Sequence, residues 1–570
     1  MNRPENVAND PLAPYRPRAG TGGRRYRDLH EHVDALAAAG LLRVIDEPIN
    51  KDTEIHPLVR WQYRGGLPEE DRKAFLFTRP TDSAGRSFKG AVLVAGLAGN
   101  AAVYRIGFDR PLEHIGAAWR EAIAAPVAPV FVDNAACHEV VNVGQALDEE
   151  GGGLDALPVP ISTPGFDNAP YLSAGHYITR DPDTGIQNVG TYRGQIKGRR
   201  RLGMNASVDF MQGIYQHWLK YKARGEPMPC AVVIGCPPLI SYAAGYKVPD
   251  ELDEIAVAGG LARGPINVTR GKTVDLVIPA ESEFVIEGLI STDELEPEGP
   301  FGESHGHVNL QEYNAFMEVT AITHRRHPIL VSIISQVSPS ESSTIRRSAM
   351  QPELFDFLRN TIGVRGLKRV HMHEPLSAVL AVFVLQFARG TKQTEIWRGL
   401  NAAATRYRFG GRWIIAVDDD IDPENNDALF WAMAYRSQPQ YDVKMVENKE
   451  AGHGPRGPRD DGALSAMLIN ATLKAPFPPV ALPKREFMEN ARALWERLKL
   501  PPLRPEAPWH GHDLGAWTEQ YERQAQMASR GEYFELGEEL ASMRRSDVEM
   551  NTSVEPAAFD RNNNHTSDKQ

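Results

Sequence analysis

The chain has 570 residues, of which 42% are hydrophobic and 24% are charged, and its formal net charge is −11. This composition is that of a globular protein long enough for two or three domains, each with its own core. The acidic balance argues against a nucleic-acid partner, because phosphate binding requires a basic surface.

The cysteine content and the hydropathy pattern indicate a reducing compartment. Three scattered cysteines, Cys137, Cys230 and Cys236, are too few for a disulfide framework or a zinc cage. Neither the apolar segment of a signal peptide nor an apolar run of about 18 residues is present, so we expect no membrane partner and a cytoplasmic location.

The N-terminal elements predict an α/β domain over residues 25–155, preceded by a disordered arm at 1–24 that is rich in Pro, Asn, Gly and Arg. Asp28 is placed to cap a helix over 29–39, which Gly40 ends. Further elements are expected as strands at 41–45, 91–94 and 130–132 and as a helix at 111–124.

From 156 to 335 the pattern changes to short strands separated by turn signals, which predicts a sheet or barrel with inserted helices. The strands are expected at 177–179, 230–234, 273–278, 284–286 and 316–323, and an inserted helix at 211–223.

The α/β alternation returns over 336–546 and ends in helices that are suited to docking subunits. The polar tail at 547–570 is expected to be disordered. The elements expected in this part are strands at 378–384 and 413–417 and helices at 427–435, 486–499 and 516–530.

The loop from Glu298 to Glu303 carries two carboxylates, with His305 and His307 directly behind them. Pro300 and two glycines disfavour a helix, so backbone shape fixes the carboxylates. Close carboxylates also push each other's proton affinities apart, which lets one stay protonated near neutral pH. The loop is therefore a candidate for proton transfer; the alternative interpretation is an acidic surface turn.

A second candidate segment runs from Asn188 to Arg193. Arg193 would provide a permanently charged, bidentate clamp for a carboxylate, and Asn188 a neutral oxygen suited to a hard divalent ion. The alternative for Arg193 is a solvated residue on a strand. Glu254, at the start of an apolar helix, is either a charge favoured by the helix dipole or a metal ligand.

Other motifs carry less information. The acidic run at 418–422 lacks the spacing and distal Glu of an EF-hand, and it predicts a strand-end turn before the helix at 427–435. No Walker loop, no strand-linked G-x-G-x-x-G and no H-E-x-x-H motif occurs in the sequence.

The segments around Asn188–Arg193, Glu254 and Glu298–Glu303, in this order and spacing, resemble the UbiD family of reversible decarboxylases, whose members use prenylated FMN with a divalent metal and usually potassium. The similarity extends over roughly residues 25 to 500. It also includes the segments 177–179, 235–238 and 418–436.

The resemblance implies a fold and a set of roles. The implied fold is an N-terminal α/β domain, a central flavin-reductase-like split β-barrel and a C-terminal α/β domain that mediates oligomerisation, as a homodimer or homohexamer. The implied catalytic network is Arg193, Glu298 and Glu303, with Glu303 delivering the proton. The residues expected to contact the flavin, which a flavin prenyltransferase would supply, are Thr179, Val189, Gly190, Thr191, Tyr192, Arg193, Ser241, Tyr242 and Lys474.

The resemblance also implies a metal site with one departure from the family pattern. Asn188 and Glu254 match metal ligands, but the segment 202–213, where family members generally supply a His, contains none. Gln212 is closest to that register, and His217 lies a few residues later. A Gln oxygen is a weaker ligand than imidazole for transition metals, so Mn, Mg and Fe all stay open.

The implied activity is reversible, non-oxidative decarboxylation of an aromatic or α,β-unsaturated acid or its CoA thioester, of which a phthaloyl-CoA type is one form. The basic run at 197–201 would either meet a CoA pyrophosphate or be a solvated turn. Two other classes remain: a metal-dependent hydrolase using Glu298, Glu303, His305 and His307, and a non-catalytic subunit of a carboxylase complex.

Overall fold

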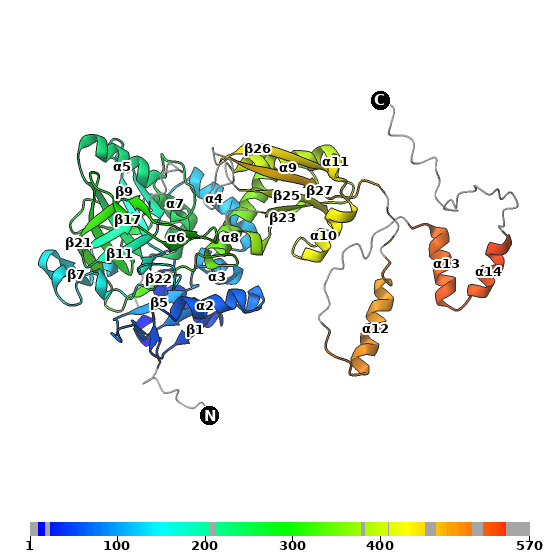
Figure 1. Ribbon diagram of the computed structural model, residues 1–570, viewed down its shortest axis with the longest axis horizontal. Coiled ribbons are helices and arrows are strands. Elements are labelled where there is room, and N and C mark those ends of the chain that lie inside the picture. The colour runs from blue at the N-terminus through cyan, green and yellow to red at the C-terminus, as the bar shows by residue number, and fades with distance from the viewer. Residues whose placement is uncertain are drawn as a thin grey trace.

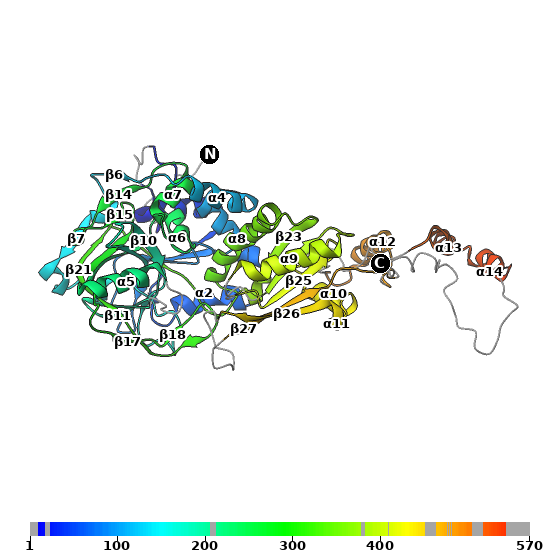
Figure 2. The ribbon, with the colours of Figure 1, turned by 90° about the horizontal axis from the view of Figure 1, so that it is seen from above.

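The computed structural model describes residues 10–17, 23–205, 212–377, 382–407, 410–450, 463–475, 477, 479, 481–503 and 517–542. A large N-terminal body packs against a C-terminal α/β unit, and helices α12 to α14 project beyond that unit along the long axis (Figures 1 and 2). None of the helices in these ranges is long and apolar enough to cross a membrane.

The first sheet combines strands from the start of the chain with one from its middle. Its order is β1-β3-β5-β22, and β22 pairs with β5 in parallel. The non-local strand makes the first α/β layer continuous with the region that follows. The elements of this layer are β1 (Leu42–Ile45), β3 (Ala74–Phe77), β5 (Ala91–Val94), β22 (Ile329–Ser332), α1 (Leu29–Ala38), α2 (Ile55–Arg64), α3 (Ala101–Phe108) and α4 (Ile115–Ala124).

Helix α1 begins where the sequence predicts. The Asp28 carboxylate accepts the Glu31 backbone N–H at 2.9 Å, and the Glu31 carboxylate accepts the Asp28 N–H at 2.8 Å. This capping box satisfies two of the N–H groups that a helix start leaves without partners. The predicted cap is confirmed.

The predicted disordered arm is wrong for residues 10–17. Ala13–Tyr15 forms a 3-10 turn, and Tyr15 is buried in the core with its ring 6.4 Å from that of His30. The polar composition of the arm favoured disorder, but the buried aromatic ring of Tyr15 holds residues 10–17 against the N-terminal core.

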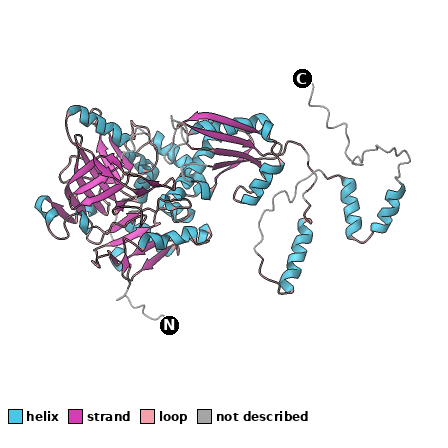
Figure 3. Cartoon of the chain, viewed as in Figure 1, coloured by secondary structure: helices cyan, strands magenta, loops and turns pink. Residues whose placement is uncertain are grey.

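The central region is an antiparallel sheet that curls into a half-barrel (Figure 3). Its nine strands run in the order β10-β9-β13-β16-β21-β12-β11-β8, with β7 paired to β21. The predicted change to β structure is confirmed. The strands are β7 (Val140–Val143), β8 (Tyr171–Leu172), β9 (His176–Arg180), β10 (Gln187–Thr191), β11 (Gly194–Gly198), β12 (Arg201–Met204), β13 (Met228–Ile234), β16 (Phe284–Ile290) and β21 (Phe316–His324).

The strand predicted at 273–278 is wrong except at its end. Residues 271–276 form a turn around the buried carboxylate of Glu287, which accepts backbone N–H groups from Lys272, Thr273 and Val274. A strand would withdraw these donors and leave a buried charge unpaired, which is costly. The local strands are β14 (Asn267–Arg270) and β15 (Val277–Pro279), with β6 (Val130–Phe131) beside β14.

Helices inserted in the central region lie along one end of the sheet. The predicted helix at 211–223 is observed as α5 (Gly213–Arg224), while Met211 lies outside the described residues. Two further helices, α6 (Pro238–Ala244) and α7 (Glu254–Ala262), contact β10.

The C-terminal unit is a five-stranded sheet with the order β23-β24-β25-β27-β26. The long helix α8 (Glu341–Asp356) leads into it from the central region. The predicted turn at 418–422 is confirmed, because β25 ends at Asp418 and α10 follows. The elements are β23 (Leu367–Met372), β24 (Val382–Phe387), β25 (Trp413–Asp418), β26 (Val443–Lys449), β27 (Leu464–Asn470), α9 (Gln393–Arg406), α10 (Asn426–Tyr435) and α11 (Pro439–Asp442).

Helices α12 and α13 confirm the two expected C-terminal helices, and a third helix, α14, was not predicted; all three extend past the C-terminal sheet (Figure 1). No residue of α12 (Arg485–Arg497), α13 (Glu519–Ser529) or α14 (Tyr533–Ser542) is buried. The predicted disordered tail at 547–570, like residues 378–381 of one predicted strand, lies outside the described residues.

Candidate active site

Arg193 lies between the two carboxylates of the 298–303 loop. Its Nε and Nη2 donate to the two oxygens of Glu298 at 2.9 and 2.5 Å, and its Nη1 donates to Glu303 Oε1 at 2.6 Å. The guanidinium also lies over the Phe301 ring, 5.3 Å from its centroid. Arg193 lies in the short connection between β10 (Gln187–Thr191) and β11 (Gly194–Gly198) and is buried, so its interpretation as a solvated strand residue is wrong.

The charges at this site reinforce one another. Burial disfavours a charged guanidinium, but the hydrogen bonds and charges of Glu298 and Glu303 outweigh burial and raise the pKa of Arg193 above its usual range. The two carboxylates differ in access: the Glu298 side chain is 0% exposed and that of Glu303 is 22% exposed. Only Glu303 can therefore exchange a proton with a bound molecule or solvent.

The 298–303 loop is held by a neighbouring segment that sequence reasoning missed. Asp167 accepts the Gly302 N–H at 2.8 Å, and Asn168 Nδ2 donates to the Gly299 carbonyl at 2.6 Å. A Cβ on Gly302 would lie 2.2 Å from Thr163 Oγ1. The loop between β17 (Glu296–Glu298) and β18 (Phe301–Gly302) thus owes its shape to residues 163–168. The adjacent Asp and Asn ahead of a proline were the available signal.

His305 and His307 do not join the carboxylates in a metal site. His305 Nε2 pairs with Asn309 Oδ1 at 2.9 Å, and His305 Nδ1 accepts the His307 backbone N–H at 3.3 Å. The described ranges hold no group of three or more His, Cys, Asp or Glu side chains placed to bind an ion. The geometry does not support the hydrolase hypothesis.

A second polar cluster lies at the same strand, next to α7. Glu254 is the first residue of α7, and its Oε2 accepts the Val189 N–H at 2.8 Å. Burial raises the pKa of Glu254 to about 7. Asp253 caps the helix by accepting the Ile255 N–H, so Glu254 is free to face β10.

Asn188 and Gln212 meet where α5 begins. A Cβ on Gly213 would lie 2.2 Å from Asn188 Oδ1, so the start of α5 packs directly on Asn188. Asn188 Nδ2 and Gln212 Oε1 are buried and have no hydrogen-bond partner among the described residues. Such atoms indicate an unfilled position for a polar ligand or ion. The structure therefore places Asn188 against the start of α5, which Gln212 precedes, and Glu254 at the backbone of the next residue, Val189.

His217 lies one turn further along α5 and has another partner. Its Nδ1 pairs with Thr179 Oγ1 at 2.9 Å, and burial lowers its pKa. Thr179 is the cross-strand partner of Asn188 in the β9–β10 register, so His217 borders the Asn188 cluster.

The hydroxyl groups of Thr191 and Ser241 share one buried imidazole. His176 Nδ1 pairs with Thr191 Oγ1 at 2.8 Å and its Nε2 with Ser241 Oγ at 2.9 Å. Burial lowers the pKa of His176 to about 4, so the ring is neutral at pH 7. Tyr192 folds back over Gly190, whose Cβ would lie 2.4 Å from the Tyr192 hydroxyl.

The two remaining residues expected at the flavin, Tyr242 and Lys474, have hydrogen-bond partners within the protein. The Tyr242 hydroxyl donates to the Leu97 carbonyl at 2.8 Å, and its ring packs on Tyr104 in the core. Lys474 belongs to the C-terminal unit, where its Nζ donates to the Arg436 and Asn470 carbonyls at 2.6 and 2.9 Å.

The basic run at 197–201 forms an ion-paired surface rather than an open anion site. Each of its four cations has a carboxylate partner. The pairs are Lys197–Glu296 at 2.9 Å, Arg199–Asp155 at 3.0 Å, Arg200–Asp148 at 3.3 Å and Arg201–Glu318 at 2.9 Å.

Known proteins share both the sequence pattern and the fold. Residues 130–337 match the family model of the 3-octaprenyl-4-hydroxybenzoate carboxy-lyase Rift-related domain, and residues 343–461 match that of the carboxy-lyase C-terminal domain. Together these matches cover more than half of the chain.

Solved structures agree over most of the chain. The UbiD-class enzyme HmfF from Pelotomaculum thermopropionicum, in complex with FMN, is 27% identical with a TM-score of 0.70, over 82% of this chain and 100% of that one. An evolved dimeric form of HmfF with prFMN is 27% identical with a TM-score of 0.68, over 80% and 97%. Sedimentibacter hydroxybenzoicus vanillic acid decarboxylase in its open form is 25% identical with a TM-score of 0.66, over 83% and 99%. The chain therefore belongs to the UbiD family of carboxy-lyases.

Proposed function

We propose that this chain is a reversible decarboxylase of an aromatic or α,β-unsaturated carboxylic acid and that it binds prenylated FMN beside β10. The observation that carries the proposal is the buried Arg193 guanidinium joined to Glu298 and Glu303. The binding of FMN by HmfF, and of prFMN by its evolved form, supports the choice of cofactor.

The residues at β10 fit a flavin phosphate held through a divalent cation. Asn188, Gln212 and Glu254 offer oxygen donors, and the buried Oε1 of Gln212 lacks a partner in the described ranges. Oxygen donors suit hard cations such as Mg²⁺ or Mn²⁺. When bound, the prenylated flavin supplies the electron sink that loss of CO₂ from an sp² carbon requires.

The side chains around the cofactor position the substrate and control one proton. Glu298, fully buried, holds the plane of the Arg193 guanidinium through two hydrogen bonds. Arg193 orients the substrate carboxylate. Glu303, the exposed carboxyl of the pair, takes up a proton at Oε2 and delivers it to the carbon that loses CO₂.

The free acid is the better substrate candidate than its CoA thioester. A CoA ester would need cations for its pyrophosphate, and the run at 197–201 already pairs its charges with carboxylates. We further propose that the nine-stranded sheet is the split barrel that holds the flavin, and that α12 to α14 dock on a second copy of the chain.

The test is an absorbance spectrum and mass analysis of protein co-expressed with a flavin prenyltransferase, followed by a CO₂-release assay on a panel of aromatic acids. We expect bound prenylated flavin and release of CO₂ from at least one acid. Turnover with metal alone and no flavin would instead support a hydrolase, and protein without flavin or turnover would support a non-catalytic subunit.

A further inference from the structure

Three hydrogen-bonded side chains, which we call the His56 relay, connect helix α2 to the loop between β8 and β9. His56 Nε2 pairs with Ser332 Oγ at 2.8 Å, and Ser332 Oγ pairs with Ser173 Oγ at 3.0 Å. His56 and Ser332 are each 1% exposed, whereas Ser173 is partly exposed. The relay therefore begins in the core of the first α/β layer and ends at a side chain that is partly open to solvent.

The imidazole of His56 sets the direction of these hydrogen bonds. Burial lowers its pKa to about 4, so the ring is neutral at pH 7 and carries a single N–H. Its Nδ1 is buried and has no hydrogen-bond partner among the described residues. A buried N–H without an acceptor is rarer in proteins than a buried acceptor without a donor. We therefore assign the proton to Nε2, which donates to Ser332.

This direction leaves Ser173 with an unused donor. Because Ser332 Oγ accepts from His56, its own O–H donates to Ser173 Oγ. Ser173 Oγ also accepts the backbone N–H of Ile333 at 2.9 Å. These two contacts use both lone pairs of the hydroxyl oxygen. The O–H of Ser173 has no acceptor within the part of the chain that the structure describes, so it is available to a bound molecule.

The strand pairing places Ser173 beside the connection that carries Arg193. The β9–β10 and β8–β11 pairings leave the stretch 173–175 opposite this connection. The register pairs on either side are Thr191–His176 and Gly194–Leu172. A backbone hydrogen bond of 3.3 Å, from Tyr192 to Gly175, joins the two stretches. The unused O–H thus lies on the backbone stretch that borders the candidate active site.

We propose that Ser173 donates its O–H to an acceptor atom of the flavin ring and that His56 and Ser332 are positioning residues that hold this orientation. The inference rests on the proposed function, which places prenylated FMN beside β10. Asn188, proposed to hold the phosphate, lies near the start of β10, whereas Ser173 faces the connection that follows its end. The ring carries carbonyl oxygens and nitrogens that accept hydrogen bonds, and a hydroxyl that is oriented before binding loses less entropy on binding.

The test measures the Kd of FMN for the flavin-free full-length protein, by quenching of FMN fluorescence. Ser173→Ala removes one hydrogen bond, so we expect the Kd to rise about 3- to 10-fold and the visible absorption band of bound FMN to shift. His56→Leu removes the N–H that orients the relay and should also raise the Kd. His56→Gln keeps an N–H and should restore most of the parent affinity.

The matched control is His371→Leu. His371 lies in β23 of the C-terminal unit and is 4% exposed, so it is buried almost as fully as His56. Its replacement should lower Tm and leave the Kd of FMN unchanged. A rise in Kd equal to that of His56→Leu would show that any buried histidine affects binding, and it would overturn the relay.

A double variant separates a relay from two independent losses. If His56 acts through Ser173, Ser173→Ala combined with His56→Leu has the Kd of Ser173→Ala alone, and additive losses would overturn the relay. Because Ser173 is partly exposed, Ser173→Ala decides the flavin contact even where His56→Leu does not fold. A parent Kd or an unshifted band in Ser173→Ala would overturn the contact while the proposed function stands. A parent protein that binds no FMN would refute both.

Discussion

Arg193 joins two carboxylates that lie 105 and 110 positions away in the chain. The resemblance to the UbiD family, rather than the residue types alone, implied that this cation and the carboxylate pair would meet. The sequence did not indicate which of the two carboxylates is exposed, because neighbouring segments decide exposure.

Replacing Arg193 with Lys should remove activity while the flavin stays bound. An ammonium is a point charge and cannot bridge both carboxylates with a rigid fork, so the substrate carboxylate loses its orientation. We expect kcat/KM to fall by about 100-fold or more, measured by CO₂ release at matched flavin content. Arg270→Lys, in an exposed pair with Asp275, should stay within about twofold of the parent. Equal losses in the two variants would contradict the assigned role.

The 298–303 loop depends on its close contact with residues 163–168. Gly302→Ala places a methyl group 2.2 Å from Thr163 Oγ1, so either the 298–303 loop or the segment 163–168 must move. Because Glu303 is the next residue, we expect kcat to fall by about 10-fold or more with a smaller change in KM. An unchanged kcat would show that the contact with residues 163–168 does not position Glu303.

Gly537 provides the control for this substitution. It lies in α14, and nothing is within 4 Å of the position that an added Cβ would take, so Gly537→Ala should leave kcat unchanged. Removing a helical glycine should also stabilise α14 by about 0.5–1 kcal/mol.

At the level of elements, local signals predicted more than long-range pairing did. The cap and length of α1, the turn after β25 and the C-terminal helices follow from side chains within a few residues of each boundary. The turn at 271–276 depends on Glu287 from another strand, and β22 joins β5 across more than two hundred residues. Neither feature could therefore be predicted from neighbouring residues in the sequence. The extents of the three proposed domains stay predictions, because strands cross between the first two.

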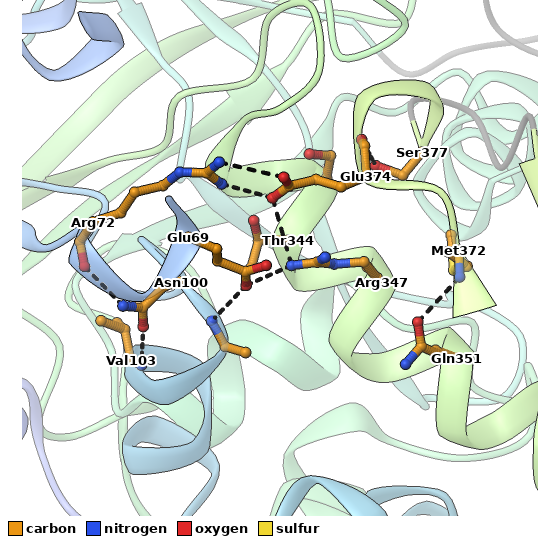
Figure 4. A network of polar contacts seen from close by, with 12 residues as sticks. Glu69, Arg72, Asn100, Val103, Thr344, Arg347, Gln351, Met372, Glu374 and Ser377 are labelled. Carbon is orange, nitrogen blue, oxygen red and sulfur yellow. Dashed lines mark hydrogen bonds and ion pairs between the residues drawn. The ribbon is translucent and has the colours of Figure 1, made fainter. Parts of the chain in front are cut away.

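At the scale of the whole molecule, the network of Glu69, Arg72, Arg347 and Glu374 connects the N-terminal body to the C-terminal unit (Figure 4). Glu374→Gln leaves two partly buried arginines without a shared counter-ion. We expect the free energy of unfolding to fall, and we will measure this as a lower Tm. The loss should exceed the ~1 kcal/mol of an exposed ion pair and stay below the ~3–5 kcal/mol of a buried one. Glu424→Gln, in an exposed pair with Arg369, should cost less than about 1 kcal/mol. A larger Tm loss in Glu424→Gln would refute the assignment.

Three buried histidines predict acid sensitivity. Burial lowers the pKa values of His32, His56 and His176 to about 4, below the 6.5 of an exposed imidazole. The unfolded chain therefore binds more protons between pH 6.5 and 4, so their contribution to stability is complete above pH 6.5 and is lost as the pH falls towards 4. The loss amounts to about 3 kcal/mol for each residue.

The substitution His32→Gln tests this pH dependence. A Gln amide can still donate to the Gly96 carbonyl, which His32 Nε2 contacts at 2.7 Å, but it does not titrate. The fall in Tm between pH 7 and pH 4.5 should be smaller in the variant than in the parent. Identical slopes would show that His32 is not held neutral.

The most direct test of proton delivery at this site is CO₂ release by flavin-loaded Glu303→Gln compared with the parent protein. Gln keeps the size of Glu303 but has no carboxyl proton to deliver. We predict a loss of turnover of about 100-fold or more with unchanged flavin content. A variant that releases CO₂ at the parent rate would contradict the role of Glu303 and the proposed function of the Arg193 network.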